Sequence, residues 1–172
     1  MLFRSIRVYG SAAVGRSIIL FLKNESSDLL EFRLMMKFTK LKAGEHTVTA
    51  LKPRNVGGSL IYIIEKDGKR ILYGNDTGFF PEETWDFLAD IRFDFVSLDC
   101  GHVSEGVERN HMNIEDIITV RKRMLQQGCA DSGTIFVCTL FSHRMGCTHF
   151  EIGERVSPYG FRVAYDGMEI NL

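Results

Sequence analysis

Residues 59–76, SLIYIIEKDGKRILYGND, decide how this chain folds. Two apolar runs of strand-forming residues flank Asp67 and Gly68, a pair that favours a tight two-residue turn between antiparallel strands. The stretch therefore predicts a β-hairpin whose second strand delivers Asp76 to its end. An acid directly after an apolar strand, followed by Thr77, needs a polar partner.

Strands and helices alternate on both sides of this hairpin. We predict strands over residues 5–10, 47–53, 93–102 and 134–143, and helices over residues 81–91 and 113–128. Residues 161–172 predict a strand, an Asp-Gly turn and a further strand, whereas the apolar residues of 31–41 are too densely spaced to assign. The alternation predicts an α/β fold, with helices packed on a mixed sheet.

Composition limits the possible classes of protein. The chain has 172 residues, of which 45% are hydrophobic, which suits one domain over residues 1–172. Its 21 basic and 22 acidic residues give a net charge of -1, so nucleic-acid and membrane-surface binding have no electrostatic support. The apolar stretch at residues 17–22 is too short to span a membrane, and we expect a cytoplasmic protein.

The four cysteines are widely and irregularly spaced and include no CxxC pair. This spacing argues against a structural zinc site and against a disulfide framework. Buried free thiols are the favoured interpretation.

Polar side chains follow several of the predicted strands. Asp76, Asp99 and His143 each come after a buried strand, and His111 precedes a helix. Functional sites of α/β folds are built at the carboxyl ends of strands. Acids and histidines gathered there indicate metal binding or general acid/base chemistry.

Five stretches carry a family resemblance: GNDTGFFPEETWDFL, SLDCGH, NHMNIEDII, SHRMGCTH and VAYDGMEINL. They resemble the second half of a metallo-β-lactamase-superfamily hydrolase, and most of all the branch that includes the cyclic-phosphate phosphodiesterase of phosphonate breakdown. The resemblance extends from about Val8 to Leu172 and is strongest after Leu60. It implies part of an αββα sandwich, a small phosphoester substrate and a divalent metal, Mn, Zn or Fe.

The resemblance also implies roles for single residues. Asp76 resembles the carboxylate that bridges two metal ions, and His111 resembles the histidine that takes part in acid/base chemistry. Asp99 and His102 stand where the family has a supporting acid and histidine, and His143 is a retained histidine close to the site.

The sequence departs from the family pattern at its principal metal ligands. The His-x-His-x-Asp-His signature is absent, and the chain is expected to begin after that region. Asn55 and Leu140 stand where two metal-binding histidines are expected. Leucine has no lone pair, and asparagine is a poorer ligand than imidazole for a transition metal. The departures predict an incomplete metal site.

Simpler roles are open for the same residues. Asp76 could bond turn amides or cap the following helix, and His111 could be a helix-entry residue satisfied by the backbone. Three hypotheses follow for the chain. It is a hydrolase-like protein with an incomplete site, a non-catalytic homo-oligomeric binding or assembly module, or one half of a site that a complementary chain completes. The exposed sheet face that such a half-fold would carry predicts a homo-oligomer.

Overall fold

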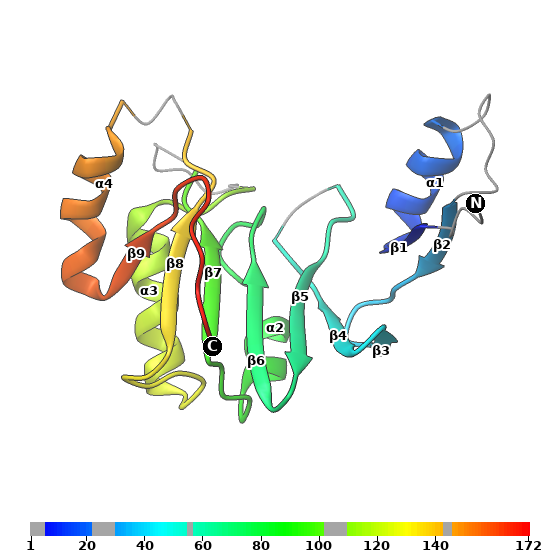
Figure 1. Ribbon diagram of the computed structural model, residues 1–172, viewed down its shortest axis with the longest axis horizontal. Helices are drawn as coiled ribbons and strands as arrows, with labels where there is room; N and C mark the ends of the chain where they lie inside the picture. Colours follow the sequence, from blue (N-terminus) through cyan, green and yellow to red (C-terminus); the bar gives the residue numbers. More distant parts are fainter. Residues whose placement is uncertain (1–5, 22–29, 55–56, 102–109, 143–145) are drawn as a thin grey trace.

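The computed structural model describes residues 6–21, 30–54, 57–101, 110–142 and 146–172. These residues form two sheets and four α-helices (Figure 1). The strands are β1 (Ile6–Gly10), β2 (Leu30–Leu34), β3 (Lys40–Ala43), β4 (His46–Leu51), β5 (Ile61–Lys66), β6 (Lys69–Gly74), β7 (Phe95–Asp99), β8 (Ile135–Thr139) and β9 (Phe161–Val163). The helices are α1 (Ala12–Phe21), α2 (Glu82–Leu88), α3 (Ile114–Gln126) and α4 (His149–Val156), and a short 3₁₀ helix covers Ser157–Tyr159.

The larger sheet has seven strands in the order β3-β4-β5-β6-β7-β8-β9. Strands β3 to β6 are antiparallel neighbours, and β6 to β9 run parallel to one another. The parallel steps need crossover connections, which α2, α3 and α4 supply in turn. The predicted α/β fold with a mixed sheet is confirmed.

The predicted hairpin forms β5 and β6. Asp67 and Gly68 both have positive φ, 49° and 78°, as a type I′ turn requires. The turn pairs Lys66 with Lys69 and leaves Ile63 opposite Leu72, so the apolar runs fall in register. The local turn chemistry therefore fixes the centre of the sheet.

The hydrophobic core lies between the sheet and the helices α2, α3 and α4, of which α2 and α3 are seen behind the strands in Figure 1. Its largest fully buried side chains include Trp85, Phe80, Phe93, Phe136 and Ile117. Cys100, Cys129 and Cys138 are buried and Cys147 is partly exposed, and all four are free thiols, as the spacing predicted. Burial raises the pKa of both the Cys100 and the Cys138 thiols to about 12.

A capping box starts α3. The Asn113 side chain accepts a hydrogen bond from the Asp116 N–H at 2.8 Å, and the Asp116 carboxylate accepts from the Asn113 N–H at 3.1 Å. We expect Asn113→Ala to lower the free energy of unfolding by about 1 kcal/mol, because it leaves a helix N–H without its acceptor. Urea unfolding measures this, with Asn113→Ser as the control that retains an acceptor. Equal losses for the two variants would contradict the capping role.

Several predicted elements end early, and one does not form. Helix α2 ends at Leu88 because Asp90 has a φ of 69°, and β8 ends at Thr139 because Leu140 has a φ of 58°. The further strand predicted after the Asp-Gly turn near the C-terminus does not form. Of that turn pair only Gly167 has positive φ, so the turn does not align two strands as the type I′ turn of β5 and β6 does.

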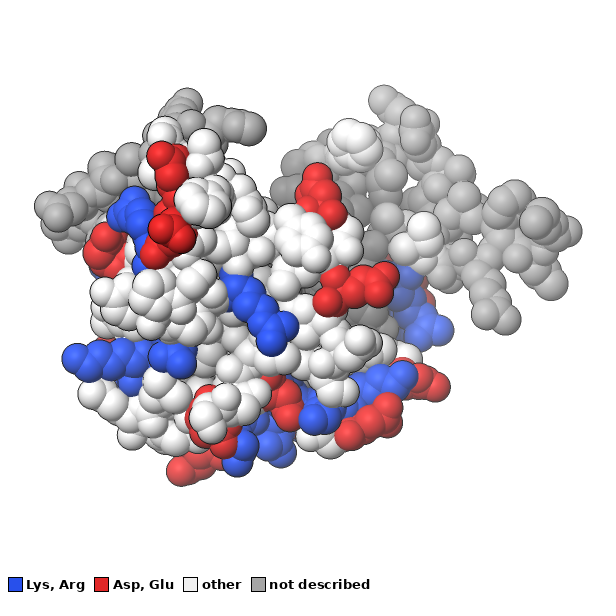
Figure 2. Space-filling view, turned by 60° about the vertical axis from the view of Figure 1, so that its left-hand side comes forward, with Lys and Arg blue, Asp and Glu red and all other residues white. Residues whose placement is uncertain are grey.

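Charged side chains of both signs lie next to one another along the lower part of the face that Figure 2 shows. No helix among the described residues is long and apolar enough to cross a membrane.

Candidate functional site

The carboxyl ends of three neighbouring parallel strands meet at one edge of the sheet. Gly74 at the end of β6 pairs with Leu98 of β7, and Asp99 at the end of β7 pairs with Thr139 of β8. Asp76 lies two residues beyond β6. Asp76 and Asp99 thus follow neighbouring strand ends, whereas His143 lies outside the described residues.

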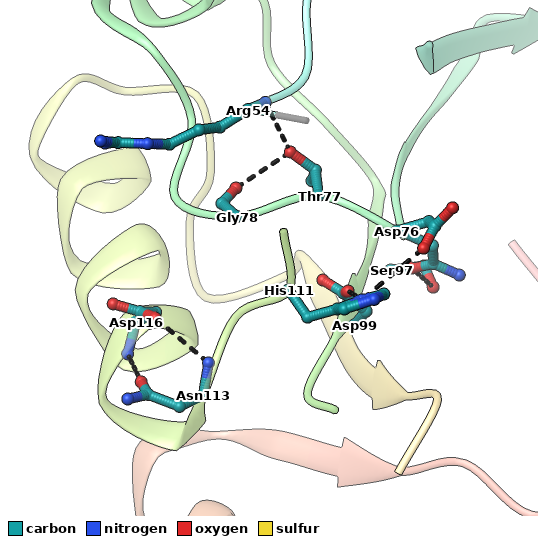
Figure 3. A network of polar contacts seen from close by, with 10 residues as sticks. Arg54, Asp76, Thr77, Gly78, Ser97, Asp99, His111, Asn113 and Asp116 are labelled. Atoms are coloured by element: carbon teal, nitrogen blue, oxygen red, sulfur yellow. Dashed lines mark hydrogen bonds and ion pairs between the residues drawn. The ribbon is translucent and has the colours of Figure 1, made fainter. Parts of the chain in front are cut away.

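Asp76 lies in a loop that buried polar groups hold in place. Thr77 Oγ1 accepts a hydrogen bond from the Arg54 N–H at 2.8 Å and donates one to the Gly78 carbonyl oxygen at 3.0 Å (Figure 3). The neighbouring Asn75 Oδ1 accepts a hydrogen bond from Ser97 Oγ at 2.9 Å. Asp76 itself has a φ of 58°, a left-handed conformation that aspartate tolerates better than most residues. Its side chain is 64% exposed, so the loop presents the carboxylate outward.

Asp99 and His111 form a close pair beside it. His111 Nδ1 lies 2.7 Å from Asp99 Oδ2 and 3.6 Å from Asp76 Oδ1 (Figure 3). Since a carboxylate only accepts, Nδ1 carries the proton in the neutral ring, and Nε2 is then the basic nitrogen. The structure thus brings together Asp76, Asp99 and His111, three of the residues singled out from the sequence.

Burial dominates the electrostatics of Asp99. Its side chain is fully buried, and its Oδ1 atom has no hydrogen-bond partner among the described residues. The Asp99 pKa is raised to about 6, mainly by burial. The hydrogen bond from His111 opposes this shift, and the nearby Asp76 charge contributes to it. Asp99 is therefore a carboxylate whose charge is costly to keep and whose principal partner is His111.

The other candidate residues from the sequence are not part of the cluster of Asp76, Asp99 and His111 in the described structure. A Cβ atom on Gly101 would lie 2.9 Å from the Leu140 carbonyl oxygen and 4.0 Å from His111 Cγ, so the backbone of Leu140 reaches the edge of the cluster. The Leu140 side chain is largely exposed and offers no ligand. Asn55, His102 and His143 lie outside the described residues, and their predicted roles stay predictions.

Metal ligands are few in the described part of the chain. No group of three or more His, Cys, Asp or Glu side chains there could hold a metal ion. Asp76 presents an exposed carboxylate, but Asp99 and the Nδ1 atom of His111 bond each other. Since a two-metal hydrolase centre needs several ligands around each ion, the described residues do not fit such a centre on their own.

One helix near the site was not expected. His149 is the first residue of α4, and its Nε2 lies 3.2 Å from the Ala164 carbonyl oxygen. The Thr148 and Glu151 side chains form a capping box before it. The T-x-x-E spacing is visible in the sequence and could have revealed the helix.

No protein-family model and no curated protein matches this sequence. Solved structures match its fold. The metallo-β-lactamase fold protein YhfI from Bacillus subtilis has a TM-score of 0.72 and 17% identity, covering 97% of this chain and 64% of its own. A diphosphatase of the PhnP family has a TM-score of 0.70 and 16% identity, covering 98% and 59%.

Zn²⁺-bound PqqB from Methylobacterium extorquens has a TM-score of 0.68 and 15% identity, covering 98% of this chain and 63% of its own. The chain thus spans about three fifths of the length of these proteins. At these identities the likeness concerns the fold, which the resemblance predicted from the sequence. Over almost all of its length, this chain has the fold of the corresponding part of metallo-β-lactamase fold proteins.

Proposed function

We propose that this chain is a hydrolase-like protein of the phosphodiesterase type, whose metal site is incomplete and whose activity alone is weak. The observation that carries the proposal is the cluster of Asp76, His111 and Asp99 at the carboxyl edge of the parallel strands. A diphosphatase among the proteins that share the fold supports a small phosphoester as the substrate class.

His111 is the acid/base group in this proposal. Its Nδ1–H donates to Asp99, which fixes the tautomer and leaves Nε2 to accept a proton from, or return one to, a reacting oxygen. Asp99 touches no substrate in this scheme. It is a positioning residue that holds the imidazole ring and its tautomer.

Asp76 is the one described carboxylate with the exposure and position of a metal ligand. A bound divalent metal, Mn, Zn or Fe, would supply an activated water and neutralise charge at phosphorus. The resemblance implies histidine ligands at positions 55 and 140, where this sequence has Asn55 and Leu140, and neither supplies an imidazole. We therefore assign no reaction step to the metal and infer weak metal retention by this chain alone.

Hydrolysis of bis(p-nitrophenyl) phosphate with added Mn²⁺ or Zn²⁺ tests the proposal. We expect slow, metal-dependent hydrolysis that Asp76→Ala abolishes and His111→Ala lowers by roughly a hundredfold or more. Asp166→Asn, an exposed turn residue, is the control and should be unchanged. Metal content is measured by plasma mass spectrometry on the same proteins, purified without chelator. Unchanged hydrolysis in Asp76→Ala would overturn the assignment of the site.

A second candidate function is a non-catalytic module that assembles through exposed apolar surface. It is favoured by a group of exposed apolar residues in the first part of the chain: Ile6, Val14, Ile19, Leu20, Phe21, Leu34 and Met36. A soluble domain seldom leaves such surface uncovered, and either another copy or a complementary chain could cover it. Absence of both bound metal and hydrolysis in the unaltered protein would favour this function over the hydrolase.

A further inference from the structure

The unit β1-α1-β2 carries an incomplete sheet. Strands β1 and β2 pair in parallel from Ile6 opposite Leu30 to Gly10 opposite Leu34, and among the described residues no third strand joins them. In Figure 1 the unit stands at the right, apart from the seven-stranded sheet. Parallel strands are found almost only in larger sheets that are covered on both faces. In the described part of the chain, the outer edge of β2 therefore has no strand partner for its backbone groups.

Helix α1 covers one face of this small sheet. A Cβ atom on Gly15 would lie 2.5 Å from Phe32 Cε1, so the Phe32 ring packs directly under the helix. Because side chains alternate along a strand, Leu30 and Leu34 share that face with Phe32. Glu31 and Arg33 point to the opposite face, where Arg7 Nε lies 3.3 Å from Glu31 Oε2.

The sequence of β2, Leu30-Glu31-Phe32-Arg33-Leu34, is complementary to itself when read antiparallel. With Phe32 opposite the same residue of a second copy, Glu31 faces Arg33 and Leu30 faces Leu34. Opposite charges and aliphatic side chains are each favourable when they lie directly across two strands. No like charges oppose each other in this register.

Apolar side chains beside the edge supply further area. The Leu34 side chain is 57% exposed and Phe21, the last residue of α1, is 87% exposed, and Ile19 and Leu20 are also exposed. Stable interfaces bury about 1,200–2,000 Å² in total, which one pair of five-residue strands does not reach. Helix α1 lies on the same face of the small sheet as Leu34, so its exposed side chains can add apolar contact.

We propose that the outer edge of β2 pairs with β2 of a second copy of this chain. The two strands run antiparallel about a twofold axis at Phe32, with Glu31 opposite the partner's Arg33. They form one sheet in the order β1-β2-β2-β1, with α1 of each copy on the same face. Such an interface is isologous and closes as a dimer. It is independent of the cluster around His111.

Light scattering on the unaltered protein is the first test, and a dimer is expected. Disulfide trapping then locates the interface. In a Cys147→Ser background, Glu31→Cys and Arg33→Cys are made in separate proteins, mixed under dissociating conditions, returned to native buffer and oxidised. A disulfide-linked dimer is expected from the mixture and not from either protein alone, because residue 31 faces residue 33 and not itself.

Charge reversal at residue 33 is an independent test of the proposed strand register. Arg33→Glu places acids opposite acids twice in each dimer and is expected to weaken association roughly tenfold or more. Arg33→Lys retains the sign and is the matched control, and circular dichroism checks that both variants fold. A monomer at every concentration would overturn the proposal and point to a different polypeptide on this edge. Equal cross-linking of the separate proteins, or an unchanged dissociation constant for Arg33→Glu, would overturn it as well.

Discussion

Asp99→Asn is expected to raise the free energy of unfolding at pH 7 to 8 by about 1–2 kcal/mol. The Asp99 carboxyl is fully buried, and its pKa is raised from 3.8 to about 6. A shift of this size corresponds to roughly 3 kcal/mol against the charged form. Loss of the charge-assisted bond to His111 offsets about 1 kcal/mol or more of the gain. Asparagine can still accept from His111 Nδ1, so the contact itself is retained.

The raised pKa of Asp99 also predicts how the effect of Asp99→Asn on stability changes with pH. Between pH 4 and 6 the folded protein keeps a proton on Asp99 that the unfolded chain has released. Stability contributed by Asp99 is therefore present below about pH 4 and falls as the pH rises through about 6. The variant lacks this titration, so the difference from the unaltered protein should be small at pH 4 and largest above pH 6.

Urea unfolding at pH 4, 5, 6, 7 and 8 measures the effect. Asp166→Asn is the control, since it removes an exposed carboxylate from a turn and should change stability by less than about 0.5 kcal/mol. A variant that is less stable than the unaltered protein at pH 8, with the same dependence on pH, would show that the buried charge is better compensated than its surroundings indicate.

The Asp99→Asn variant also distinguishes the role of Asp99 in positioning His111 from its effect on the stability of the fold. Asparagine keeps an acceptor for His111 Nδ1 but loses the charge-assisted strength of that hydrogen bond, so it positions the ring less firmly. We therefore expect slower hydrolysis in a more stable protein, a combination that simple damage to the fold does not give. Sites that are tuned for chemistry commonly reduce stability in this way.

The sequence predicted those elements that depend on interactions between residues close together in the chain. The Asp67-Gly68 turn and the Asn113 cap each act within a few residues, and both predicted elements formed. The strand-end position of Asp76 and Asp99 follows from the same local patterns. Their meeting with His111 depends on the strand order β6-β7, which no local pattern in the sequence encodes.

Two of the elements that sequence reasoning missed, α1 and β2, depend on distant partners. Helix α1 contains Gly15 and several β-branched residues, which weaken helix propensity. It needs that glycine because Phe32, seventeen residues later, packs against the position. Strand β2 likewise depends on β1 for its only described ladder. Such long-range contacts leave no periodic signal in either segment.

Trp85→Ala is expected to lower the free energy of unfolding by about 3–5 kcal/mol, because it removes the largest side chain of the core. The Trp85 ring lies 5.3 Å from the Phe80 ring and 5.9 Å from the Phe79 ring, and the Arg123 guanidinium stacks 4.4 Å above it. Phe79 and Phe80 lie in the same loop between β6 and α2 as Asp76. The cavity should therefore also loosen the segment that presents the Asp76 carboxylate.

Trp85→Phe is the matched control. Its expected stability depends on the indole Nε1 atom of Trp85, which phenylalanine lacks. Trp85 Nε1 is buried without a hydrogen-bond partner in the described part of the chain. A buried donor without an acceptor costs about 1–3 kcal/mol, and phenylalanine removes that donor while it keeps most of the ring contacts. We expect the phenylalanine variant to lie within about 1 kcal/mol of the unaltered protein. Trp85 is the only tryptophan, so unfolding has to be followed by circular dichroism. A loss in the phenylalanine variant as large as that in the alanine variant would mean that Nε1 makes a bond that stabilises the core.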